Sequence, residues 1–84
     1  MADYSVLLHL DLLEAVPKRG KQRELIIDFI RSLASSPNTV GDYTDLDESQ
    51  RTRQVKIIGK YAITYWANHA VRTVVVVEIQ PADR

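Results

Sequence analysis

The sequence predicts an α+β fold, in which helices pack on one face of a largely antiparallel sheet. Apolar residues recur with helical period over residues 25–33, which is typical of a helix with one buried side. Three strand-length segments rich in β-branched and aromatic residues follow in the C-terminal half, separated by short polar connections. A further short apolar segment, residues 4–9, has the length and composition of an N-terminal strand.

The length of 84 residues is that of one small domain, so we expect a single domain over residues 1–84. Apolar residues make up 45% of the chain and charged residues 26%, the balance of a soluble globular protein. A core of this size has little stability to spare. A partner protein or a second copy of the chain is therefore a natural source of further stability.

The segment after the first strand, residues 10–16, carries three leucines with Asp11 and Glu14 opposite them, which fits a short amphipathic helix. The same residues also fit a continuation of the strand. Pro17 and Gly20 then mark a tight connection to the main helix. Together these segments predict a helical hairpin that follows the first strand.

The main helix begins at Lys21 and is predicted to end near Pro37, because the residue before a proline is driven out of the helical region. Burying an aliphatic or aromatic side chain contributes about 1.5–3 kcal/mol, so we expect the apolar side of this helix to face a sheet. That side is formed by Leu25, Ile26, Phe29, Ile30 and Leu33.

Residues 38–50 are polar and acidic and predict a loop, with Tyr43 and Leu46 tucked against the core. This segment contains four acidic residues and no basic one, whereas residues 51–84 contain six basic and two acidic residues. The net charge of the whole chain is zero. Two arrangements fit this segregation: the stretches fold apart and leave a basic face, or they lie together and cancel.

The three C-terminal strands are predicted over residues 53–58, 61–67 and 73–79, and their short connections favour an antiparallel meander. Side chains alternate between the two faces of a strand, so one face takes the helices. We expect the other face to keep a mixed set partly exposed, a surface that suits a partner. The alternation does not decide which set points inward; the candidates for exposure are Lys56, Thr64, Trp66, Glu78 and either Val74 or Val76.

The chain contains no cysteine and two isolated histidines, His9 and His69, so we predict no metal and no cofactor. No basic stretch opens the sequence, and the longest aliphatic run, residues 74–77, is far short of a membrane span. We therefore expect no signal peptide, no membrane contact and a cytoplasmic location.

The order and spacing of these elements resemble the RelE/ParE superfamily of bacterial toxins, also called plasmid-stabilisation proteins. The likeness covers nearly the whole chain and rests on four short motifs. They are Leu-Ala-Ser-Ser-Pro at residues 33–37, Gly-Lys-Tyr at 59–61, Tyr-Trp at 65–66 and Val-Glu-Ile at 77–79. The resemblance implies a toxin that a cognate antitoxin neutralises. Members of the family are either ribosome-dependent ribonucleases that cut messenger RNA or poisons of DNA gyrase.

The family's ribonucleases offset the charge of the reacting phosphate with Lys and Arg side chains of the sheet. This sequence has Ala62 and Gln80 at two positions where that pattern has Arg, and it ends without the aromatic or imidazole tail that is common there. The candidate catalytic residues are therefore cations at other positions, Arg53, Lys56 and Lys60. An alternative interpretation makes them solvated charges that pair loosely with the acidic stretch.

Candidate contacts to RNA or to a partner come from two parts of the chain. Tyr65 and Trp66 are adjacent, so they point to opposite faces: one is core, and the other is free to stack on a base or an antitoxin side chain. Lys18 and Arg19 cluster before the main helix as possible phosphate or partner contacts. The remaining candidates for nucleic-acid or partner binding are Arg51 and Arg72.

An alternative function fits the missing arginines and the zero net charge. In that alternative the chain is a gyrase-directed toxin, or a degenerate member that acts only by binding its antitoxin or itself, as in a homodimer.

Overall fold

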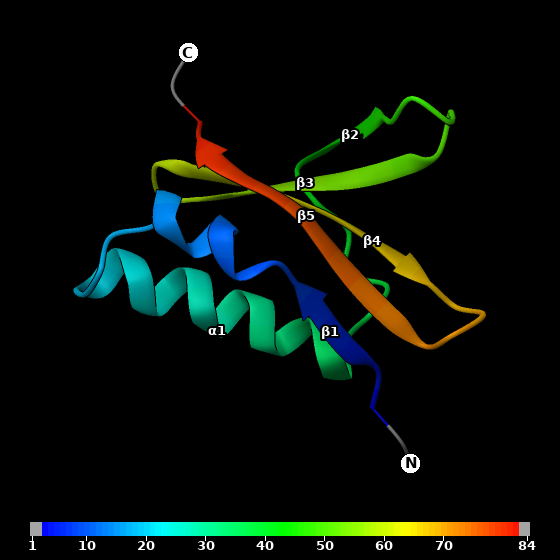
Figure 1. Ribbon diagram of the computed structural model, residues 1–84, viewed down its shortest axis with the longest axis horizontal. Helices are drawn as coiled ribbons and strands as arrows, with labels where there is room; N and C mark the ends of the chain where they lie inside the picture. The colour runs from blue at the N-terminus through cyan, green and yellow to red at the C-terminus, as the bar shows by residue number, and fades with distance from the viewer. Residues whose placement is uncertain (1–2, 83–84) are drawn as a thin grey trace.

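The computed structural model describes residues 3–82, which form one five-stranded sheet with helices on one of its faces (Figure 1). The strand order is β1-β5-β4-β3-β2, with β1 parallel to β5 and every other pair antiparallel. In chain order the elements are β1 (Ser5–Leu8), the 3₁₀ helix η1 (Leu10–Ala15), α1 (Lys21–Ser35), β2 (Tyr43–Leu46), β3 (Thr52–Ile58), β4 (Tyr61–Asn68) and β5 (Thr73–Pro81).

The predicted α+β class is confirmed, and β3, β4 and β5 form the predicted antiparallel meander. The prediction of a loop over residues 38–50 is wrong, because β2 lies within it and pairs with β3 as a fifth strand. Tyr43 and Leu46 are more than half exposed rather than tucked against the core. Both are exposed because β2 is the outermost strand, and the β2–β3 hairpin extends beyond the part of the sheet that α1 covers (Figure 1).

The segment η1 is a helix of six residues, as the first of the two alternatives predicted, and not a continuation of β1; its geometry is that of a 3₁₀ helix. Its first turn is capped by His9, whose Nδ1 accepts a hydrogen bond from the backbone N–H of Asp11 at 3.3 Å. A 3₁₀ geometry is common in such short pieces between two elements. Leu12 and Leu13 pack against the core, whereas Leu10 points into solvent.

Helix α1 ends where the Ser-Ser-Pro sequence predicted, and it packs on the sheet through Ile26, Ile30 and Leu33, all of which are buried. Leu25 was predicted to be part of the apolar side, but it is 43% exposed because it lies at the margin of the contact. The sheet residues beneath the helix are Ile63, Tyr65, Val74, Val76 and Ile79. In the part of the chain that the structure describes, no helix is both long and apolar enough to cross a bilayer.

The start of α1 is tied to the turn between β3 and β4 by the side-chain amide of Gln22. Its Nε2 donates to the carbonyl oxygen of Ile58 at 3.0 Å, and its Oε1 accepts from the backbone N–H of Lys60 at 3.2 Å. Gly59, between these two residues, has a φ of +61°, and a Cβ there would collide with the Gln22 amide. The motif at residues 59–61 therefore fixes the position of the hairpin against the helix.

The strand register decides which side chains face away from the helices, because directly paired residues share a face. Tyr65 and Ile63 pack against α1, so their neighbours along β4 point to the opposite side. We call this side the open face: Leu7, Tyr43, Asp45, Arg53, Val55, Ile57, Ala62, Thr64, Trp66, Val75, Glu78 and Gln80.

The predicted exposed set differs from the structure at Lys56, at Thr64 and at the two valines. Lys56 pairs with Ile63 and lies on the side of the helices. Thr64 is on the open face but is buried beneath larger neighbours, with 3% of its surface exposed. Of the two valines left open, both Val74 and Val76 are core residues.

Candidate functional site

The open face meets the acidic stretch at the β2–β3 hairpin, where Arg51, just before β3, and both cations of β3 have carboxylate partners. The two stretches therefore lie together and cancel, and the alternative of a separate basic face is not what the structure shows. The three ion pairs are Asp45 with Arg53, Asp47 with Arg51 at 3.4 Å, and Asp42 with Lys56 at 3.7 Å.

Arg53 makes the tightest of these pairs. Its Nε and Nη2 donate to the two carboxylate oxygens of Asp45 at 2.9 and 3.0 Å, a two-pronged contact between directly paired residues. The hydrogen bonds that Arg53 donates to Asp45 raise the pKa of the Arg53 guanidinium, and the nearby carboxylates of Asp47 and Glu78 act in the same direction. The charge of Arg53 is therefore balanced by Asp45, and its Nε and Nη2 donors are already engaged.

Asp47 organises the turn between β2 and β3. Its Oδ1 accepts the backbone N–H groups of Arg51 and Ser49, both at 2.8 Å. The hydrogen bond from Arg51 is the main reason that the pKa of Asp47 is lowered, although partial burial opposes it. Gln50 completes the turn with a φ of +65°, a left-handed conformation that is uncommon outside glycine. The acidic residues of this segment thus hold a tight hairpin.

The three candidate catalytic cations do not come together. Arg53 lies on the open face, Lys56 lies on the other face beside Asp42, and Lys60 is exposed in the β3–β4 turn. No single phosphate can contact all three side chains in this arrangement. Their catalytic role stays a prediction.

Ala62 and Gln80, the two departures from the ribonuclease pattern, are direct partners across β4 and β5. Ile57 pairs with Ala62 from the other side, so all three lie in one row across the open face. The surface of this row comes from Ile57 and Gln80, since Ala62 is buried between them, and it carries no cation to offset the charge of a reacting phosphate.

Arg51 and Trp66, both predicted to bind RNA or a partner, lie together at one end of the sheet. The Arg51 guanidinium carbon is 4.1 Å from the centre of the Trp66 ring, a cation–π stack. Tyr65 points the other way, as predicted: it is buried, its hydroxyl donates to the carbonyl of Thr39 at 3.0 Å, and burial raises its pKa to about 12.

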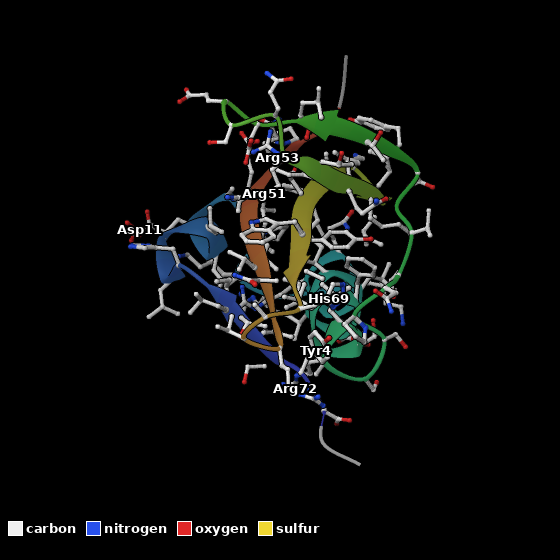
Figure 2. The ribbon with its side chains drawn as sticks, turned by 90° about the vertical axis from the view of Figure 1, so that its right-hand side faces the viewer. Tyr4, Asp11, Arg51, Arg53, His69 and Arg72 are labelled. Atoms are coloured by element: carbon white, nitrogen blue, oxygen red, sulfur yellow. The ribbon has the colours of Figure 1, made fainter. Side chains whose placement is uncertain are left out.

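Arg72, the third predicted contact residue, lies at the opposite end, as Figure 2 shows. Its guanidinium is 5.3 Å from the ring of Tyr4, and the Tyr4 hydroxyl is 2.7 Å from Nδ1 of His69. Tyr4 has no functional role among the sequence-based predictions, because nothing in the sequence pairs residues that are 65 positions apart.

Lys18 and Arg19 are exposed in the connection before α1, beside a shallow surface hollow that Arg23 and Asp28 also line. They are thus separate from the Arg51–Trp66 stack, and the structure does not join the two predicted binding groups. Within residues 3–82, no three His, Asp or Glu side chains are grouped as they would be to hold a metal ion.

Two solved structures have the same arrangement of helices and strands. A chain of the archaeal RelE–RelB complex from Pyrococcus horikoshii OT3 matches with a TM-score of 0.77 and 16% identity, over 98% of each chain. The 84-residue protein therefore has a RelE-like fold. A chain of the toxin–antitoxin complex RelBE2 from Mycobacterium tuberculosis matches with a TM-score of 0.70 and 20% identity, over 94% of this chain and 98% of that one.

The resemblance predicted from short motifs is therefore confirmed at the level of the fold. No protein-family model matches the sequence, and no curated protein matches it in a sequence search. The RelE-like chain carries its own set of side chains on the open face, and its function has to be argued from those.

Proposed function

We propose that the chain is the toxin component of a two-component toxin–antitoxin system, acting in the cytoplasm and neutralised by a cognate antitoxin protein. The observation that carries this proposal is the RelE-like fold along almost the full chain, in two neighbours that were both solved as complexes. The surface supports it as well. Leu7 on the open face is 60% exposed beside Val75, an apolar area that suits burial by a protein partner.

Induction of the chain alone in bacteria tests this proposal. Growth should stop on induction and resume when the cognate antitoxin is expressed with it. The matched control is the variant Leu33→Asp, which places a charge at a fully buried position and should not fold. Normal growth with soluble, folded wild-type protein present would contradict the proposal.

Cleavage of ribosome-bound messenger RNA by Arg53, Lys56 and Lys60 is the narrower version of this function. It requires that the three cations act from separate places, since they lie on two faces and a turn. Replacing all three by Ala should then abolish cleavage of messenger on purified ribosomes. Intact messenger with the wild-type chain would remove the ribonuclease activity and leave the toxin role untouched.

The geometry favours the other version, in which the chain acts by binding and not by cutting RNA. The row of Ile57, Ala62 and Gln80 and the occupied fork of Arg53 are the observations in its favour. For a gyrase-directed toxin, DNA cleavage complexes should accumulate on purified gyrase. A member that only binds its antitoxin or a second copy of itself should leave gyrase unaffected and be seen as a complex or a homodimer by light scattering.

A further inference from the structure

Strands β3 and β4 separate at the end of the sheet that carries Trp66. Their last direct pair is Gln54 with Tyr65, although β3 begins at Thr52 and β4 continues to Asn68. The edge of β4 that faces β3 is therefore without a strand partner over residues 66–68, within the described part of the chain. β3 leaves at this point because it follows β2 in the ion-paired hairpin.

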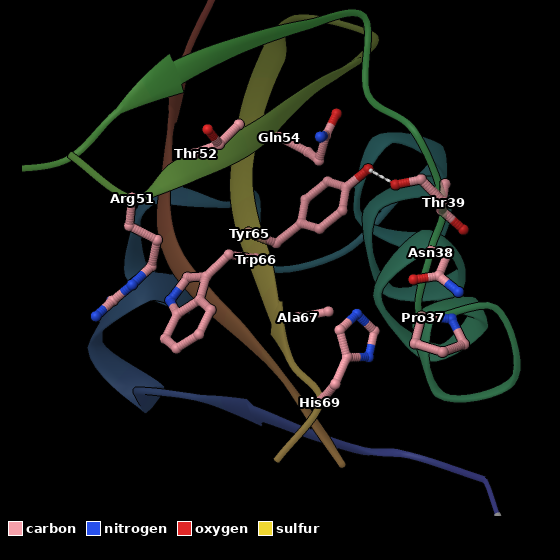
Figure 3. Close-up of a pocket in the computed structure, with 10 residues that line it drawn as sticks. All are labelled: Pro37, Asn38, Thr39, Arg51, Thr52, Gln54, Tyr65, Trp66, Ala67 and His69. Atoms are coloured by element: carbon pink, nitrogen blue, oxygen red, sulfur yellow. Dashed lines mark hydrogen bonds between the residues drawn. The ribbon is translucent and has the colours of Figure 1, made fainter. Parts of the chain in front are cut away.

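A hollow of about 400 Å³ fills the gap between the separated strands, and Figure 3 shows the residues around it. Residues 37–39, which follow α1, form its other wall. This wall is held in place because the Tyr65 hydroxyl donates to the carbonyl of Thr39 at 3.0 Å. A volume of this size is in the usual range of small-molecule sites.

The lining of the hollow combines an aromatic ring, one cation and several neutral polar groups, and it contains no acidic residue. Gln54 accepts the backbone N–H of Gly41 through its Oε1 at 2.9 Å, so its amide N–H₂ is left to donate. His69 uses Nδ1 toward the Tyr4 hydroxyl, so its Nε2 is left for a ligand. Asn38 adds a second amide at the rim.

Arg51 and Trp66 form the charged side of the hollow. The guanidinium lies over the indole ring at 4.1 Å, which orients its planar fork. The ion pair of Arg51 with Asp47 joins Nη1 to Oδ2 at 3.4 Å, and no hydrogen bond links the two side chains. The Asp47 carboxylate is meanwhile bound to two backbone N–H groups at 2.8 Å. The remaining donors of Arg51 are therefore available to an anion such as a phosphate.

We propose that this hollow binds a nucleotide across the free edge of β4, with the phosphate on Arg51 beside Trp66 and the base on the other side of the strand, toward the amides of Gln54 and Asn38. A nucleotide matches the lining because it joins a planar ring that has donors and acceptors on its edge to an anion one sugar away. The site lies apart from the row of Ile57, Ala62 and Gln80, and it does not depend on the proposed toxin role. The nucleotide is either free or an unpaired residue of an RNA strand.

The fluorescence of Trp66, the only tryptophan of the chain, reports binding directly. Titration with AMP, GMP, CMP and UMP should give a saturable change for at least one of them. Orthophosphate and ribose 5-phosphate lack the base, so their affinity should be lower than that of the nucleotide by roughly tenfold or by more. The indole N–H signal of Trp66 in NMR spectra should shift along with the fluorescence.

Two variants separate a built site from general attraction to a cation. Arg51→Gln should weaken nucleotide binding roughly tenfold, the usual loss for one charged hydrogen-bond donor. Lys21→Gln removes an exposed cation outside the hollow and should leave binding unchanged. Circular dichroism should show both variants folded.

An RNA octamer distinguishes the two sources of the nucleotide. Much tighter binding of the octamer identifies an RNA strand as the ligand, whereas equal affinity identifies a free nucleotide; each result supports the site. Three results overturn it: no saturable change with any nucleotide at millimolar concentration, equal affinity for orthophosphate, or unchanged binding by Arg51→Gln. Because the assay uses purified protein, its outcome is independent of whether the chain arrests growth.

Discussion

The two faces of the sheet are stabilised by different interactions. The covered face joins residues that are distant in sequence, such as Leu33 and Val74, through apolar contact with no exposed surface. The open face near β2 joins residues fewer than ten positions apart, such as Asp45 and Arg53, through ion pairs. Apolar packing fixes the fold, whereas the ion-paired face is free to change. A RelE-like fold therefore persists at 16% identity while the open face carries Ala62 and Gln80.

The two faces should differ most in how much a substitution lowers the free energy of unfolding, and the largest loss is expected from Leu33→Ala on the covered face. Leu33 is fully buried between α1 and the sheet, so its truncation should lower the free energy of unfolding by about 2–5 kcal/mol. Leu25→Ala, on the same helix but 43% exposed, is the matched control and should cost less than about 1 kcal/mol. Urea denaturation of both variants measures the difference. Equal losses would show that α1 is not held by this contact.

The covered face was predictable because its signal is local and repeated. Ile26, Ile30 and Leu33 recur with helical period, and each strand of the meander is marked by its own composition and by a turn. The register settled what alternation alone left open, namely which set points inward. It could not be read from the sequence because both faces of β3 carry apolar residues, Val55 and Ile57 on one and Ile58 on the other.

β2 was missed for a physical reason. Its four residues contain an aspartate and follow a glycine and another aspartate, a composition that predicts a loop. It forms a strand because all four of its residues pair with β3, and the ion pairs of Asp45 with Arg53 and of Asp47 with Arg51 accompany this pairing. The charge segregation suggested such ion pairs but did not place them. The same limit applies to the hollow: Arg51 and Trp66 were predicted individually, whereas their stack depends on how the strands separate.

An intermediate effect is expected from Gly41→Ala. This substitution disturbs the contact between the segment that leads into β2 and strand β3. A Cβ at this position would lie 2.5–2.8 Å from backbone atoms of Val55, which cannot move without shifting β3. We expect a loss of about 1–3 kcal/mol in the free energy of unfolding, typical of overpacking. Hydrogen exchange should show the amides of β2 losing protection while those under α1 keep theirs.

Val40→Ala is the control for this change, since Val40 is adjacent in sequence and 74% exposed. It should alter neither stability nor exchange. Uniform loss of protection in Gly41→Ala, over α1 as well as β2, would mean that the two regions unfold as one unit. The ion-paired hairpin would then have no stability separate from that of the covered face.

The smallest effect is expected from Asp45→Asn, which removes one charge from the tightest ion pair. The pair is partly exposed to solvent, with 21% of the Arg53 side chain and 41% of the Asp45 side chain accessible. Its contribution should therefore be about 0–1 kcal/mol, and it should shrink further in about 1 M salt because exposed charges are screened. Glu48→Gln is the control, since Glu48 has no ion-pair partner among residues 3–82. A salt-independent loss as large as that of Leu33→Ala would place Asp45 and Arg53 among the residues that fix the fold, and the open face would then not be free to vary.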